Sequence, residues 1–129
     1  MQVFLSYVQA DEAFAKALSA QLIRRGISVW TTDYDLLPGD NVWLRIGDAL
    51  QKSNAMVVLI SPDSMRSEYV RHEIEYALGN PNYAGRVFPV EVRPAKNIPW
   101  ILQNFKTFDG REGAAKLSES IAHALKRVA

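Results

Sequence analysis

The sequence predicts an α/β fold in which a doubly wound sheet of five parallel strands is covered by helices on both faces. Short apolar segments alternate five times with segments of helical periodicity, as is typical of a parallel sheet with right-handed crossovers. The run Ala55–Ile60 contains no polar residue, as expected for a strand buried on both faces. With 129 residues, 48% of them hydrophobic, the chain is expected to form one domain over residues 1–129 around a single core.

Two strand–helix pairs are predicted in the first half of the chain. Val3–Leu5 is a short apolar run, and the segment after it repeats apolar residues at helical spacing. Gly26 is expected to end this helix, and Ile27–Trp30 begins a second extended segment. Residues 31–39 contain acidic turn formers and a Pro-Gly pair, after which helical spacing resumes over Val42–Leu50. The sequence therefore predicts a long loop before the second helix.

In the second half of the chain, the sequence predicts three strands and two helices. After the central strand, helical spacing covers residues 67–78, and Val87–Val92 is predicted to be the fourth strand. Pro89 lies inside this strand, and because proline donates no ladder hydrogen bond it favours an edge position or a bulge. A weak fifth strand is expected within Phe105–Phe108, and an amphipathic helix over residues 111–128 closes the chain.

A ligand crevice is expected at the carboxyl ends of the strands, where the strand order of a doubly wound sheet reverses. For five strands in the order 2-1-3-4-5, this crevice lies between the first and third strands, and Ser6-Tyr7 and Ser61-Pro62 would border it. Ser6 and Tyr7 are therefore candidate ligand contacts, although residues at this place can equally well only begin a turn.

Charge and composition narrow the choice of partners. Lys and Arg total 15 against 14 acidic residues, a net charge of +1, and the longest basic run is Arg24-Arg25. Neither nucleic acid nor a membrane is therefore expected as a partner. Cysteine is absent, and His72 and His123 lack ligand spacing, so no metal site is predicted. Without an export signal or an apolar run of about 18 residues, we expect a soluble, cytoplasmic protein.

Glu73 lies at the border of the apolar face of the helix predicted over residues 67–78. At about 100° per residue, this helix has one apolar stripe, formed by Val70, Ile74, Ala77 and Leu78. Glu73 is roughly 85° from the centre of the stripe. A border carboxylate commonly pairs with a nearby Arg or Lys, so spacing alone leaves a structural and a functional role open.

Three groups of residues form sequence boxes along the chain. They are Phe4–Tyr7 with Asp11; Val29-Trp30 followed by Asp33, Asp35 and Leu37–Asp40; and Val57–Pro62 followed by Ser67–Tyr69 and Glu73-Ile74. Each box alone is weak, but in order and spacing the chain resembles a Toll/interleukin-1 receptor (TIR) domain over nearly its whole length. A further box of that family, usually a Phe-Trp pair near the last strand, corresponds only to Phe105-Lys106.

This resemblance implies a flavodoxin-like fold with the strand order 2-1-3-4-5 and an enzymatic activity. In the enzymatic TIR domains a glutamate on the third helix cleaves NAD+ between nicotinamide and ribose, and Glu73 is similar in position. The resemblance implies an NAD+ glycohydrolase in defence or virulence signalling, which releases nicotinamide and leaves ADP-ribose or a cyclic isomer. NAD+ is then the substrate, and no cofactor is expected. The candidate substrate-binding residues are Phe4, Ser6, Tyr7, Asp33, Trp43 and Tyr69.

These candidates also have structural interpretations. Phe4 is favoured as a core residue, Trp43 as a packing residue and Asp33 as a loop solvator. Tyr69 occupies the position where the family usually has Trp, and a tyrosine can still stack on a ring but offers less surface. His72 lies on the side of its helix away from the apolar stripe and is expected to face solvent.

The loop from Thr31 to Val42 resembles the segment with which TIR domains dock onto one another. Self-association through this loop is expected to complete the site in active assemblies. The alternative function is a non-catalytic TIR–TIR interaction module, an adaptor or scaffold, which would need no carboxylate at position 73. Asp40 can equally be a helix cap. The candidate interface residues are Asp35, Leu37, Pro38, Gly39 and Asp40.

Overall fold

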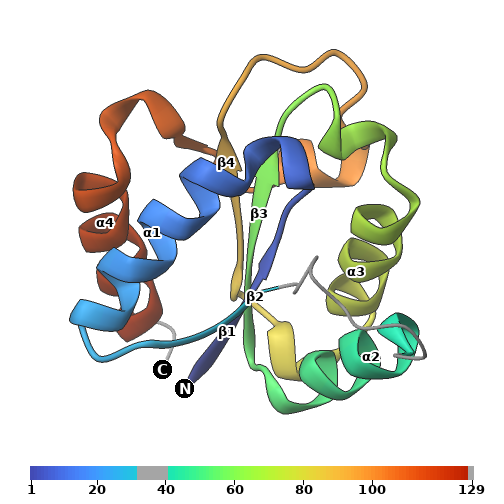
Figure 1. The fold of residues 1–129 in the computed structure, drawn as a ribbon, viewed down its shortest axis with the longest axis horizontal. Coiled ribbons are helices and arrows are strands. Elements are labelled where there is room, and N and C mark those ends of the chain that lie inside the picture. The colour runs from blue at the N-terminus through green and yellow to red at the C-terminus, as the bar shows by residue number, and fades with distance from the viewer. Residues whose placement is uncertain (32–40, 128–129) are drawn as a thin grey trace.

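The computed structural model describes residues 1–31 and 41–127, and it has the α/β architecture expected from the sequence (Figure 1). Five parallel strands form one sheet in the predicted order, β2-β1-β3-β4-β5. The strands are β1 (Gln2–Ser6), β2 (Ser28–Thr31), β3 (Ala55–Ile60), β4 (Val87–Glu91) and β5 (Phe108–Asp109). The α-helices are α1 (Glu12–Arg24), α2 (Val42–Lys52), α3 (Glu68–Leu78) and α4 (Ala114–Arg127). Within the described ranges, none of the helices combines the length and apolar character needed to cross a membrane.

The sheet separates two hydrophobic cores, where the sequence predicted one. α1 and α4 cover one face of the sheet, and α2 and α3 cover the other (Figure 1). Side chains alternate along β1, so that Val3 and Leu5 belong to the α1–α4 core and Phe4 to the α2–α3 core. β3 is buried at every position, which confirms the prediction of a strand covered on both faces.

Pro89 is accommodated in β4 although this strand lies between β3 and β5 and pairs with β3 in continuous register. The N–H of Val92, three residues after Pro89, donates to the Ile60 carbonyl at the end of β3. Because successive residues of a strand direct their N–H groups to opposite sides, the nitrogen of Pro89 faces away from β3. On that side the pairing with β5 begins only at Val90. The missing donor therefore interrupts no hydrogen bond between β3 and β4.

The connection between β4 and β5 differs from the predicted strand–helix alternation. It contains a 3-10 helix, η4 (Trp100–Asn104), in place of an α-helix. Pro99 lies just before η4 and disfavours helical backbone in the residue before it, so the helical segment begins only after this proline. Strand β5 occupies only the end of the predicted segment Phe105–Phe108 and extends one residue further. After β5 the backbone lies so close to β4 that position 110 has no room for a side chain. A Cβ added at Gly110 would lie only 2.5 Å from the Glu91 carbonyl oxygen.

Candidate active site

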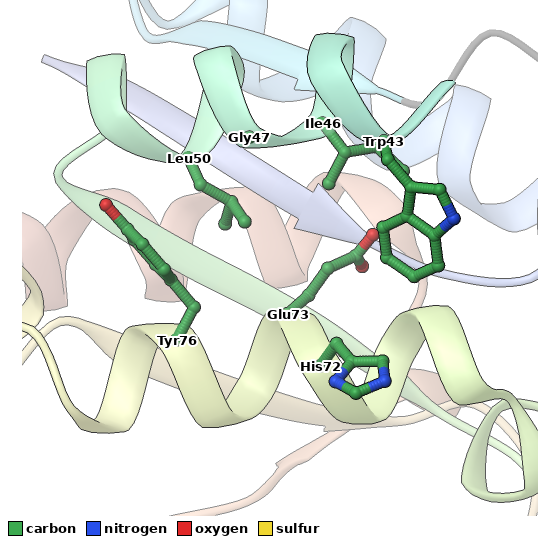
Figure 2. A pocket seen from close by; sticks show the side chains of 7 residues that line it. All are labelled: Trp43, Ile46, Gly47, Leu50, His72, Glu73 and Tyr76. Carbon is green, nitrogen blue, oxygen red and sulfur yellow. The ribbon is translucent and has the colours of Figure 1, made fainter. Parts of the chain in front are cut away.

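A hollow of about 290 Å³ lies between α2 and α3 on one side of the sheet. Figure 2 shows the Glu73 side chain extending from α3 toward α2, with its carboxylate directed toward the indole of Trp43. The lining residues are Trp43, Ile46, Gly47 and Leu50 from α2 and His72, Glu73 and Tyr76 from α3. The hollow thus combines one acidic group with aromatic and aliphatic walls.

A side-chain cap and an apolar stripe place α2 beside the hollow. The Asn41 side-chain oxygen accepts a hydrogen bond from the Leu44 N–H at 3.1 Å, which satisfies one of the free donors at the helix start. The cap is therefore Asn41 and not Asp40, which the sequence had suggested for this role. Ile46 is buried in the α2–α3 core. Gly47 has no atom within 4 Å of the place where a Cβ would lie, so this part of the wall has space.

The same kind of cap begins α3, where Ser67 Oγ accepts a hydrogen bond from the Val70 N–H at 3.2 Å. Val70 and Ile74 are buried toward the sheet, as the apolar stripe predicts. Glu73 is also buried, with 3% of its surface exposed, so the predicted border position is corrected. The reason is that α2 packs against the flank of α3 that carries Glu73, which makes the covered face wider than the apolar stripe.

Among the residues that the structure describes, one hydrogen bond holds the Glu73 carboxyl group. The Ser6 hydroxyl at the end of β1 donates to Glu73 Oε1 at 2.6 Å. Burial raises the pKa of Glu73 from 4.5 to about 7, while the hydrogen bond from Ser6 acts in the opposite direction. Within the described ranges, no Lys or Arg forms an ion pair with this carboxylate. Near neutral pH, Glu73 therefore carries a negative charge in part of the molecules, without a cationic partner in the described chain.

Two aromatic rings from different helices stack at the rim of the hollow. The centroids of the Trp43 indole and the Tyr69 ring are 4.5 Å apart, and their planes differ by 21°. The His72 ring meets the indole edge-on at 5.8 Å. Trp43 is 49% exposed and Tyr69 42% exposed, so this pair presents ring surface to solvent. His72 is exposed, as predicted, but it also borders the hollow.

The candidates on β1 and directly after it are distributed over both faces of the sheet. Phe4 is fully buried and stacks on Trp30 with centroids 4.9 Å apart. Ser6 is also fully buried and reaches Glu73. Tyr7 belongs to the α1–α4 core, on the far side of the sheet from the hollow. The structure therefore brings Ser6, Trp43 and Tyr69 close to the hollow and places Tyr7 away from it.

A polar network occupies the predicted crevice between β1 and β3. The Ser61 hydroxyl donates to the buried Asp11 carboxylate at 2.5 Å. The Arg93 guanidinium donates to Asp11 at 2.9 Å and to Asp63 at 3.1 Å. Ser61 is thus engaged in a structural contact and does not line the hollow. The hollow lies on the α2–α3 face and not in the crevice that the strand order predicts.

Six of the residues predicted from the sequence lie outside the described ranges. They are the substrate-binding candidate Asp33 and the interface candidates Asp35, Leu37, Pro38, Gly39 and Asp40. Their proposed roles stay predictions.

Sequence reasoning missed several residues that line the hollow, including Gly47, Leu50 and Tyr76. One signal for Gly47 was present, because an isolated glycine inside a helical pattern often has a packing or functional reason. The role of Leu50 and Tyr76 depends on the packing of α2 against α3, for which the periodicity of either helix alone carries no information.

The parallel five-stranded sheet makes this a doubly wound domain. Glu73, buried beside a small hollow and without a cationic partner among the described residues, gives the domain a carboxylate site. The chain matches the family described as TIR domain over residues 3–125, and it belongs to this family.

Two curated relatives match part of the chain. It is 27% identical over 74 residues to the 2' cyclic ADP-D-ribose synthase AbTIR of Acinetobacter baumannii (strain 1295743), covering 57% of this chain and 28% of that protein. It is 32% identical over 74 residues to the probable 2' cyclic ADP-D-ribose synthase TcpO of Methanobrevibacter olleyae, covering 57% of this chain and 22% of the relative. The matched parts thus span less than a third of either relative.

A solved structure has the same fold over almost the full length. The TIR domain of the Toll-related receptor TRR-2 from Hydra magnipapillata superposes with a TM-score of 0.75 at 23% identity, covering 97% of this chain and 94% of that one. At this identity the likeness supports the fold alone.

Proposed function

We propose that this TIR domain is an NAD+ glycohydrolase that cleaves the bond between nicotinamide and ribose. The observation that carries the proposal is Glu73, a buried acid at a hollow with no cationic partner among the described residues. Its place on α3 resembles that of the catalytic glutamate of enzymatic TIR domains. The names of the two curated relatives, both 2' cyclic ADP-D-ribose synthases, support the same chemistry. NAD+ is the substrate in this proposal, and no separate cofactor is needed.

The Glu73 carboxylate would act on the charge that develops during cleavage. When the ribose–nicotinamide bond breaks, its electron pair moves to the ring nitrogen, so that neutral nicotinamide leaves and the ribose becomes an oxocarbenium-like cation. A carboxylate close to this cation stabilises it and can accept a hydrogen bond from a ribose hydroxyl. Because the nicotinamide ring of NAD+ is already cationic, its departure requires no general acid. The role resembles that of the second carboxylate in glycoside hydrolysis.

The product depends on which nucleophile reaches the cation. Attack by water adds a hydroxyl group to the ribose carbon, releases a proton and yields ADP-ribose. Attack by a ribose hydroxyl, with loss of its proton, or by an adenine nitrogen closes a ring and yields a cyclic isomer. The names of the two relatives favour a cyclic product.

The hollow accommodates only one end of the substrate. Its volume of about 290 Å³ lies at the lower limit of ligand pockets, roughly 300 Å³. We assign the nicotinamide–ribose end to the hollow and the rim rings of Trp43 and Tyr69 to stacking against a flat base. The rest of the dinucleotide then extends beyond the rim. This is consistent with a site completed by a second TIR domain through the loop with Leu37, Pro38 and Gly39, which lies outside the described ranges.

The deciding experiment is the incubation of purified protein with NAD+ at high protein concentration, with and without a crowding agent. We expect release of nicotinamide, and the mass and retention of the second product distinguish ADP-ribose from its cyclic isomers. Glu73→Gln, which keeps the size of the side chain but removes its charge, should abolish release. Absence of nicotinamide from the wild-type reaction under all these conditions would contradict the proposal.

The alternative is a non-catalytic TIR–TIR interaction module. It is favoured by two exposed apolar side chains, Leu44 on α2 and Trp100 on η4, which are 69% and 75% exposed. Sedimentation velocity at several concentrations tests self-association, and replacement of Leu37–Gly39 should abolish it. Self-association without nicotinamide release would support the alternative. A cytoplasmic location and a role in defence or virulence signalling stay predictions in either case.

A further inference from the structure

We infer that Ser6 is a positioning residue, whose hydroxyl anchors one oxygen of the Glu73 carboxylate and leaves the other for the substrate. The inference rests on the proposed function and deepens it. The sequence suggested that Ser6 contacts the ligand directly. The structure leads to a different role, because Ser6 is fully buried and does not line the hollow.

Ser6 occupies a firmly held place in the fold. It is the last residue of β1, which lies between β2 and β3 in the sheet, and it is in register with Val58 of β3. Its hydroxyl reaches across to α3 and donates to Glu73 Oε1 at 2.6 Å. The position of the carboxylate is thereby tied to the central strands as well as to its own helix.

A serine hydroxyl has one hydrogen and can donate to only one carboxylate oxygen. Within the described ranges, Glu73 Oε2 has no hydrogen-bond partner. The two oxygens therefore have different surroundings: Oε1 is anchored by Ser6, whereas Oε2 makes no such bond, and the Glu73 side chain lines the hollow. A donor that fixes one oxygen also limits the rotation of the carboxyl group, so that Oε2 keeps a defined direction.

Few polar groups in the described chain surround this carboxyl group. From α3, His72 and Tyr76 border the same hollow, whereas the lining residues of α2 carry no ionisable group. From the sheet, the side chains of the α2–α3 core are apolar, as at Phe4 and Val58. The Ser6 hydroxyl is thus the hydrogen-bond donor through which the described fold stabilises the charged form of Glu73.

The hydrogen bond also has an electrostatic effect. Burial raises the pKa of Glu73 to about 7, and the bond from Ser6 limits this rise because it favours the ionised form. If the Ser6 hydroxyl served only as a hydrogen-bond partner for a buried acid, its loss would change the free energy of unfolding. If it also positions the Glu73 carboxylate, its loss changes in addition the pH at which Glu73 becomes active.

The test compares Ser6→Ala with Ser6→Thr, which retains the hydroxyl. The first measurement is the titration of the Glu73 side-chain carboxyl carbon by NMR in protein labelled with ¹³C on glutamate, without NAD+. Its signal is assigned by its loss in Glu73→Gln. We expect the midpoint to rise in Ser6→Ala and to remain close to the wild-type value in Ser6→Thr. If Ser6→Ala does not fold, Ser6→Cys, in which the thiol is a weak donor, should also raise the midpoint.

The second measurement is the pH profile of nicotinamide release. In Ser6→Ala the acidic limb should move to higher pH, and kcat at pH 7 should fall on the order of tenfold, with little change in KM. A full ångström of misplacement can cost about a hundredfold. A midpoint that does not change in folded Ser6→Ala would overturn the role of Ser6, whatever the activity. Absence of nicotinamide release by the wild type would instead overturn the proposed reaction, so the two failures are distinguishable.

Discussion

The indole of Trp43 on α2 stacks on the ring of Tyr69 on α3, with the two centroids 4.5 Å apart. Tyr69 stands four residues before Glu73, where the TIR family usually has Trp. The aromatic surface at this rim is therefore built from two rings on two helices. A flat substrate base can contact either ring while the stack keeps both in place.

Trp43→Ala should weaken substrate binding more than it slows cleavage. An aromatic pair contributes about 0.5–1.5 kcal/mol beyond the area that it buries, so KM is expected to rise by up to about tenfold with a smaller change in kcat. The measurement is the dependence of nicotinamide release on NAD+ concentration. Ile23→Ala is the matched control, because Ile23 is an exposed apolar residue on α1, on the other face of the sheet, and does not line the hollow. An equal effect of both substitutions would contradict the role of the ring pair.

The buried Glu73 predicts a pH dependence of stability. Since the folded-state pKa is raised from 4.5 to about 7, the folded state binds the proton more tightly than the unfolded state. The corresponding stability is present below pH 4.5 and is lost as the pH rises through 7. At about 1.4 kcal/mol for each pKa unit, the loss amounts to about 3 kcal/mol.

Urea unfolding of wild type and Glu73→Gln between pH 4 and pH 8 measures this effect. The free energy of unfolding of the variant should rise relative to the wild type as the pH increases over this interval. Glu75→Gln, which changes an exposed acid on the same helix, should follow the wild type at every pH. If the difference in the free energy of unfolding between Glu73→Gln and the wild type did not change with pH, the Glu73 carboxyl group would have the same pKa in the folded and unfolded states.

Gly47 offers a test of the hollow itself. A Cβ at this position meets no atom within 4 Å, and replacing glycine inside a helix stabilises it by about 1 kcal/mol. Gly47→Ala should therefore raise the melting temperature, while Gly47→Leu should fill part of the hollow and raise KM. Thermal unfolding and nicotinamide release measure the two effects separately. A leucine variant with the KM of the wild type would mean that the substrate binds elsewhere.

The network in the crevice between β1 and β3 should contribute to stability. Asp11→Ala removes the acceptor of the buried Ser61 hydroxyl, and loss of such a partner costs about 1–3 kcal/mol. Asp63→Ala breaks more exposed contacts with Arg66 and Arg93 and should cost less than about 1 kcal/mol. Urea unfolding at pH 7 compares the two variants. Equal losses would show that Asp11 contributes no more than a surface acid.

Much of the fold was predictable because local patterns and global packing agree. The apolar run of β3 predicted a central strand, and the buried stripe of α3 predicted how that helix meets the sheet. These signals depend on residues close together in sequence. The family boxes then predicted the strand order, which the structure confirms.

The exceptions arise from contacts between distant segments. A helical wheel describes one helix, so the burial of Glu73 under α2 could not be read from α3 alone. The position of Tyr7 on the opposite face, in contrast, continues the local alternation of Val3 and Leu5. The filling of the crevice depends on a distant segment, because Arg93 lies 82 residues after Asp11. Pairings of this kind are specified by tertiary packing and have no local signature.

Met1 and the end of α4 lie on the α1–α4 side of the sheet (Figure 1), whereas α2 and α3, which line the hollow, cover the other face. α4 ends at Arg127, and Met1 lies with Arg25, Ile27, Leu125 and Lys126. A flexible linker attached at either terminus therefore leaves the opposite side unobstructed. The domain can be coupled to a bead, a lattice or a fluorescent carrier through either end, with the side that carries the hollow turned outward.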